Sequence, residues 1–216
     1  MKSNKFPKKD DNKMIKKRID NLISEIDNHP QESENYLKLA TILIEEGSFD
    51  QATQLLEQAK NAVKNPQDLD YDLAVCYYMQ GKYDQALKLL DHIPNDDLVL
   101  YQKSLVLMKM GQLQKALAYA LTISETDDRV LELLGDIWLG LGEFDQAEKS
   151  YTTISQDQRS AKVNFMLGIT ILTKNRDLAE KYFTISQKQD IKYFEQAQKK
   201  YDALLKIIGD KDKFNG

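Results

Sequence analysis

Apolar residues recur along most of the chain at helical spacing, and polar turns interrupt them at regular intervals. Between Met14 and Asn28 the apolar positions fall three or four residues apart, which places them on one face of a helix. Pro30 follows this segment and cannot continue a helix. The same spacing returns in longer segments, each with a polar turn in its middle, and predicts five helical hairpins. They lie at about residues 33–61, 68–92, 97–123, 128–155 and 158–187.

A short motif marks the turn of each predicted hairpin. It reads Gly-x-aromatic-Asp-Gln-Ala at Gly47–Ala52, Gly81–Ala86 and Gly142–Ala147. A weaker copy lies at Gly111–Ala116, and a degenerate copy at Lys174–Ala179 has no glycine. Glycine readily adopts the left-handed backbone that often ends a helix, and an acid favours the positive end of the next helix. The final alanines recur at intervals of 34, 30, 31 and 32 residues, which indicates one repeated helix–turn–helix unit.

Small and large residues hold fixed positions before each glycine. The residues seven positions before it are small: Ala40, Ala74, Ser104 and Gly135. The residues four positions before it are large and apolar: Leu43, Tyr77, Leu107 and Trp138. Small and large side chains in register are what closely packed antiparallel helices need.

These features together resemble the tetratricopeptide repeat family: the small residue, the large apolar residue, the Gly-x-aromatic-acid turn and the closing alanine. The resemblance covers roughly residues 30–187. It implies an all-α fold, a right-handed superhelical stack of antiparallel hairpins (an α-solenoid) with about 12 helices. Asp70 and Lys103 depart from the family pattern, since an apolar residue is expected at both positions.

The ends of the chain differ from the repeats. We expect residues 1–13 to be a disordered basic tail and residues 14–28 to form a cap helix over the first hairpin. Residues 189–208 are expected to form a C-terminal capping helix, which makes 14–208 one array, and residues 209–216 a disordered tail. The polar residues that precede the hairpins are interpreted as helix caps rather than catalytic or metal-binding groups. They are Ser33, Asp68, Asp96 with Asp97, and Asp127 with Asp128.

One face of the first helix of each hairpin is set by the residues ten, six and three positions before the glycine, and we name it the inner stripe. In the family this stripe contacts ligands, so the resemblance implies a peptide-binding groove. Its residues are Leu37, Thr41, Ile44, Tyr71, Val75, Tyr78, Tyr101, Leu105, Met108, Glu132, Asp136 and Leu139. The fifth hairpin adds Phe165, Ile169 and Leu172.

The chemistry of the inner stripe narrows the kind of ligand. Family members that hold a C-terminal carboxylate place Asn, Lys and Arg there, whereas the first three hairpins here place Tyr, Leu, Ile and Met. We therefore predict an amphipathic helix or an apolar peptide segment, with Glu132 and Asp136 meeting a basic part of it. Three alternatives stay open: the stripe is part of the core of a tight superhelix, the terminal helices cover it, or a second copy of the chain does.

Few residues suggest a catalytic or metal-binding site. The two histidines, His29 and His92, are far apart in the sequence, and no Cys/His cluster has metal-ligand spacing. Cys76 lies in an apolar helical segment and is interpreted as a packed residue. We expect no catalytic residue, no metal and no cofactor, and therefore a non-catalytic scaffold or adaptor whose partner is another protein or peptide.

Charge adds one further alternative. Residues 1–18 carry eight Lys/Arg and two Asp, so they hold +6 and the rest holds −10 of a total of −4. This arm suggests a factor associated with nucleic acid or a membrane, but it lacks the aromatic pattern of such sites, and we favour a solvated tail. A structural subunit of a larger complex is a third possibility. One cysteine and no long apolar run favour a cytoplasmic protein.

Overall fold

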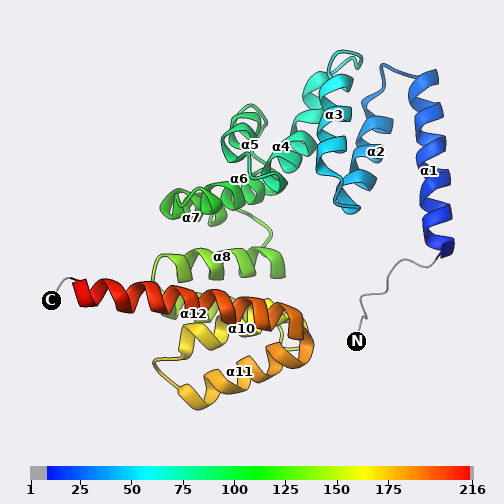
Figure 1. Cartoon of the computed structure of the whole chain (residues 1–216). Helices are drawn as coiled ribbons and strands as arrows, with labels where there is room; N and C mark the ends of the chain where they lie inside the picture. The colour runs from blue at the N-terminus through cyan, green and yellow to red at the C-terminus, as the bar shows by residue number, and fades with distance from the viewer. Residues whose placement is uncertain (1–8, 215–216) are drawn as a thin grey trace. The chain divides into compact units, whose positions relative to one another are not determined.

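The structure is a computed structural model that describes the backbone of residues 9–214, and the side chains of 13–203, 205 and 206. This part of the chain contains twelve α-helices, one short 3-10 helix (η1) and no strand (Figure 1). The helices are α1 (Lys9–Asn28), α2 (Ser33–Glu45), α3 (Phe49–Ala59), η1 (Pro66–Leu69), α4 (Asp70–Met79), α5 (Tyr83–Leu90), α6 (Asp97–Lys109), α7 (Leu113–Ala120), α8 (Asp128–Gly140), α9 (Phe144–Thr153), α10 (Ala161–Ile171), α11 (Arg176–Gln189) and α12 (Ile191–Phe214). The predicted all-α fold is confirmed. Helices α2 to α10 lie within the five predicted segments, and α11 extends two residues past the end of the last one.

Four of the five turns use glycine as predicted. Gly47, Gly81 and Gly111 have φ of 74° and Gly142 has φ of 80°, all in the left-handed region. At Gly47 the turn closes with two backbone hydrogen bonds, from Gly47 N–H to the Ile44 carbonyl (3.0 Å) and from Ser48 N–H to the Leu43 carbonyl (2.8 Å). This pair of bonds satisfies carbonyls that the end of the helix would leave without partners.

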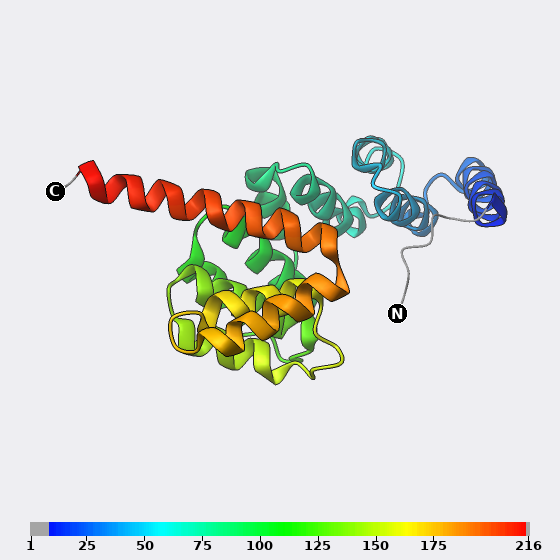
Figure 2. The same ribbon diagram turned by 60° about the horizontal axis from the view of Figure 1, so that its bottom comes forward.

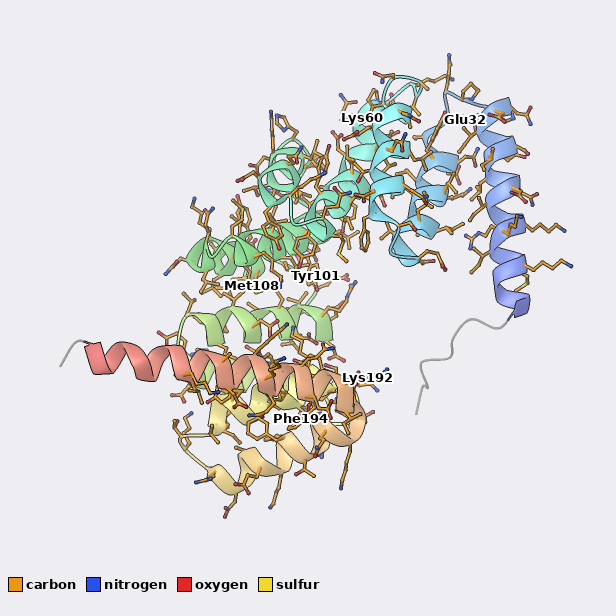
Figure 3. The ribbon with its side chains drawn as sticks, viewed as in Figure 1. Glu32, Lys60, Tyr101, Met108, Lys192 and Phe194 are labelled. Carbon is orange, nitrogen blue, oxygen red and sulfur yellow. The ribbon has the colours of Figure 1, made fainter. Side chains whose placement is uncertain are left out.

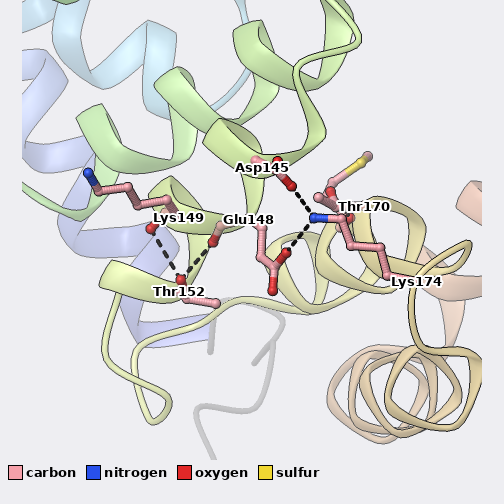
Figure 4. A network of polar contacts seen from close by, with 7 residues as sticks. Asp145, Glu148, Lys149, Thr152, Thr170 and Lys174 are labelled. Atoms are coloured by element: carbon pink, nitrogen blue, oxygen red, sulfur yellow. Dashed lines mark hydrogen bonds and ion pairs between the residues drawn. The ribbon is translucent and has the colours of Figure 1, made fainter.

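The fifth turn is built differently. Asn175 has an extended backbone, and its side chain accepts a hydrogen bond from the Leu178 N–H at the start of α11. Lys174 reaches back to α9, where it pairs with Asp145 and, at 3.2 Å, with Glu148 (Figure 4). The turn therefore needs no left-handed residue, which explains why its glycine is dispensable.

The boundaries of the terminal helices differ from the prediction. Helix α1 begins at Lys9 rather than Met14, because apolar periodicity marks only the part of a helix that packs. Residues 1–8, the rest of the predicted disordered tail, lie outside the described residues. Helix α11 continues to Gln189, and Asp190 then caps α12 by accepting a hydrogen bond from the Tyr193 N–H (3.0 Å). The last helix therefore runs over 191–214 rather than 189–208, and only 215–216 of the predicted C-terminal tail lie outside the described residues.

Two of the predicted helix caps are confirmed. Asp96 accepts a hydrogen bond from the Val99 N–H (2.8 Å), and Asp127 accepts one from the Val130 N–H (3.0 Å). The prediction is wrong for Ser33 and Asp68. Ser33 is the first residue inside α2 and donates its hydroxyl hydrogen bond to Asp68 (3.0 Å), which itself lies within η1.

The chain divides into two compact units, residues 1–110 and 111–216, within what the sequence suggested as one array. Within each unit the helix pairs pack mainly on their neighbours along the chain, as in repeat proteins. In the first unit, α1 packs on α2 through Leu22, Leu39 and Ile42, as expected of a cap helix. In the second unit, α12 contacts α10 and α11, and Figures 1 and 2 show it starting beside the end of α11.

The two charged residues at apolar positions of the repeat are both in ion pairs within the first unit. Asp70, only 6% exposed, accepts from Lys60 Nζ at 2.6 Å. Lys103, 4% exposed, lies 3.1 Å from Asp91 and donates to Asn95 at 3.0 Å. Buried charges are tolerated when they are paired, so these residues replace apolar packing with electrostatic contacts.

Candidate functional site

The inner stripe of the first unit crosses three helices that adjoin one another, α2, α4 and α6. None of its nine residues is buried: Thr41 is exposed and the other eight are partly exposed. They are Leu37, Thr41, Ile44, Tyr71, Val75, Tyr78, Tyr101, Leu105 and Met108. Figure 3 shows Tyr101 and Met108 on the same side of α6. The first unit therefore presents aromatic and aliphatic side chains in neighbouring rows on one face.

Residues of the inner stripe pack on the hydrophobic core of the first unit. Leu37 and Ile44 pack against the core that α2, α3 and α4 share. Tyr71 and Tyr78 pack against the core between α4, α5 and α6, and the ring of Tyr78 lies 5.9 Å from that of Tyr83, tilted by 50°. Side chains fixed in this way lose little conformational freedom when they bind a ligand.

The acidic part of the predicted site lies in the second unit, and the chain supplies its own cation there. Lys162 of α10 donates to Glu132 at 2.7 Å and pairs with Asp136, both on α8. The Tyr151 hydroxyl donates to the other oxygen of Asp136 at 2.6 Å. Two carboxylates and one ammonium leave a net charge of about −1 on this cluster, less than the two acids alone suggest.

These charges shift the pKa of nearby groups. Burial alone would lower the pKa of Lys162, but the ion pairs with Asp136 and Glu132 outweigh it and hold the pKa above its usual value. Burial raises the pKa of the Tyr193 hydroxyl, an effect that Lys162 opposes and the two carboxylates reinforce. Lys162 therefore stays charged at any physiological pH.

Helix α12 covers one residue of the fifth row of the predicted stripe, Phe165. Phe165 is only 2% exposed and packs against Phe183 of α11, at a ring distance of 5.3 Å. From α12, Phe194 and Tyr193 approach it edge-on, at 5.7 and 6.3 Å. Figure 3 shows Phe194 at the start of α12. The alternative of coverage by a terminal helix thus holds at Phe165, whereas Ile169 and Leu172 stay partly exposed.

Sequence reasoning missed the role of Lys162 and Tyr193. Lys162 is the only charged residue of α10, which could have marked it as a residue with a specific partner. Nothing in the sequence showed which acidic residues it would contact. Tyr193 belongs to a helix whose start the periodicity placed two residues too early. Both contacts join segments distant in the sequence.

The described residues show few groups suited to catalysis. Cys76 is buried, and burial raises the pKa of its thiol to about 11, so the nucleophilic thiolate is scarce. Within the described part of the chain, no three His, Cys, Asp or Glu side chains lie together as metal ligands would. None of the described helices has a long enough apolar stretch to cross a membrane.

Comparison with known proteins identifies the repeat. A model of the tetratricopeptide repeat matches residues 43–113, the segment that holds the first two turns and reaches the third. Within this segment the helices α3 to α6 match the tetratricopeptide repeat. The fold expected from the resemblance, a solenoid of such repeats, is also that of the similar solved structures.

The chain spans only a small part of the curated relatives that it matches. It is 28% identical over 151 residues to "TPR repeat-containing protein MJ1428" from Methanocaldococcus jannaschii, covering 67% of this chain and 26% of that protein. In the "Crystal structure of APC/C hetero-tetramer Cut9-Hcn1", a chain matches with a TM-score of 0.70 and 16% identity, over 82% of this chain and 37% of that one. The "Crystal structure of YrrB: a TPR protein with an unusual peptide-binding site" matches with a TM-score of 0.58 and 19% identity, over 82% of this chain and 97% of that one.

Proposed function

We propose that the chain is a non-catalytic scaffold that binds another protein through the inner stripe of its first unit. The bound segment is an amphipathic helix or an apolar peptide. The observation that carries the proposal is the partial exposure of every apolar residue of the stripe on α2, α4 and α6. Apolar surface in continuous rows is usually a place of contact, and tyrosines offer large area with a hydroxyl at the tip.

Two similar structures support a binding role by their own titles. One is described as having an unusual peptide-binding site, and the other belongs to a hetero-tetramer. Both structures share the fold of this chain at low sequence identity. They therefore support protein binding in general, and the kind of ligand has to be argued from the residues of this chain.

The test compares the partners that tagged wild type and variants of this chain recover from the organism's own cells, quantified by mass spectrometry. The variant Tyr78→Ala/Tyr101→Ala should lose its specific partners, because truncating a central aromatic contact costs about 2 kcal/mol or more. Phe144→Ala is the matched control, since Phe144 is 46% exposed but lies outside the stripe. Met108→Gln removes apolar character with little loss of volume and should weaken recovery as well. Equal recovery by all four proteins at equal melting temperature would contradict the proposal.

A second candidate function rests on the basic arm. The described part of this arm exposes Lys13, Lys16, Lys17 and Arg18 on α1. If the arm contacts nucleic acid or anionic lipid, replacing these four residues with Gln should reduce binding to single-stranded RNA or to phosphatidylserine vesicles, and added salt should weaken it. Binding that is absent, or unchanged by salt and by the substitutions, would exclude this function.

A further inference from the structure

We infer that Asp72 receives a cationic side chain of the bound segment, so the partner of the inner stripe is an amphipathic helix with Lys or Arg beside its apolar face. This inference rests on the proposed function and names the partner's chemistry. It starts from a half-buried carboxylate that the protein leaves without a cation.

Asp72 differs from the other carboxylates that are not exposed. Six such groups occur among the described residues: Asp70, Asp72, Asp97, Glu132, Asp136 and Glu148. Four of them have a lysine partner, namely Asp70 with Lys60, Glu132 and Asp136 with Lys162, and Glu148 with Lys174. Asp97 also takes part in a hydrogen bond or electrostatic interaction. The Asp72 carboxylate bonds only its own backbone N–H, and among the described residues no Lys, Arg or His lies within 4.0 Å of it.

The position of Asp72 connects it to the stripe. It follows Tyr71 directly and precedes Val75 by three residues on α4, so it borders the row that these residues form. In the register of the repeat, the same position on α2 is Lys38, whose charge is already paired with Glu34 at 2.6 Å. Asp72 therefore places an uncompensated negative charge along the edge of the apolar surface.

The energetics favour a cation from outside the chain. Burial raises the pKa of Asp72, although the first turn of α4 offers the positive end of a helix dipole. The hydrogen bond from its own backbone N–H offsets only part of the lost hydration. A Lys or Arg on the ligand would supply the missing charge, and it would also fix the register of a ligand helix that an apolar stripe alone would leave free to slide.

The experiment measures binding of three labelled synthetic helical peptides to the full-length protein by fluorescence anisotropy. Each peptide has about 18 residues, or five helical turns, with one leucine face. They differ only beside this face, where they carry Lys, Gln or Glu. We expect wild type to bind the Lys peptide about tenfold more tightly than the Gln peptide, as for a partly buried charge pair, and the Glu peptide weakest.

Two variants assign this preference to one residue. Asp72→Asn should bind the Lys and Gln peptides equally, whereas Asp50→Asn, which neutralises an exposed acid on α3, should keep the preference of wild type. A Lys preference that survives in Asp72→Asn would overturn the inference and assign it to the overall negative charge. Binding that Tyr101→Ala abolishes but Asp72→Asn leaves unchanged would overturn the inference alone. If none of the peptides binds wild type, both the inference and the proposed use of the stripe fail.

Discussion

The ring of Tyr151 fills the space that a side chain at Gly135 would need: a β-carbon added there would lie 2.4 Å from Tyr151 Cε1. Tyr151 is fully buried, and its hydroxyl donates to Asp136 at 2.6 Å, so the ring cannot easily move away. The close contact of α8 and α9 in the second unit therefore depends on the absence of one methyl group.

Gly135→Ala should lower the free energy of unfolding by about 1–3 kcal/mol, as overpacking of a core does, even though alanine favours helix more than glycine. Urea unfolding followed by circular dichroism measures the change. The control is Gly140→Ala in the same helix, whose added β-carbon would meet only the flexible end of Leu113 at 3.1 Å. A loss of equal size in both variants would contradict the role of Tyr151.

The sequence predicted that α8 and α9 pack closely, but not that Tyr151 fills the space beside Gly135. The recurrence of small residues at one position before each turn indicated close helices, and Ala40, Ala74 and Ser104 are indeed fully buried. Which ring fills the space opposite Gly135 depends on how α9 rotates, and a local pattern does not fix that. The glycine turns were predictable because backbone φ is a local property.

The pair of Lys60 and Asp70 offers a second prediction. Lys60→Met leaves Asp70, whose side chain is only 9% exposed, without its cation, so we expect a loss of about 1–3 kcal/mol in unfolding free energy. Lys38→Met removes an exposed partner of Glu34 and should leave stability unchanged within error. Chemical denaturation of both variants at pH 7 gives the comparison. Similar values for the two would show that Asp70 tolerates the loss.

The Cys76 thiol should be protected in the folded protein. Burial raises its pKa from 9.0 to about 11, which lowers the thiolate fraction near pH 8 by about 100-fold even before access is considered. Labelling with Ellman's reagent should therefore be slow in buffer and rapid in concentrated urea, where one thiol per chain reacts. Fast labelling of the native protein would contradict the packing of α4.

Asp72 should lower the free energy of unfolding as the pH rises, whereas a carboxylate paired with a cation would raise it. In the unfolded chain its pKa is near the ordinary 3.8, and burial raises the folded value. The cost of its charge is absent below the unfolded pKa, grows as the pH rises through the interval between the two values, and stays constant above the folded pKa. The stability advantage of Asp72→Asn over wild type should therefore be larger at pH 7 than at about pH 4.

Parallel urea unfolding of the two proteins across this range tests the sign. Asp50→Asn serves again as the control, because it neutralises an exposed carboxylate of the same unit. An advantage of Asp72→Asn that grows toward acid pH would mean that a cation pairs with Asp72 in the folded protein.

The candidate site was predictable to different degrees in its two parts. Counting back from the glycines placed Tyr71, Val75 and Tyr78 correctly on one partly exposed row of α4. The same count selected Phe165, which α12 buries, because contacts with a helix outside the repeat leave no trace in the repeat's period. The missing cation of Asp72 also needed the structure, since an unpaired charge is defined by what surrounds it.

The four left-handed turns also constrain how this gene can change. A single base substitution that replaces glycine with another amino acid always adds a β-carbon, and asparagine, which tolerates this backbone best, is not among the products. Nearly every missense change at Gly47, Gly81, Gly111 or Gly142 therefore strains a turn. The turn at Asn175 has no such constraint, because its backbone is extended rather than left-handed. We therefore expect its sequence to vary more than the four glycines do.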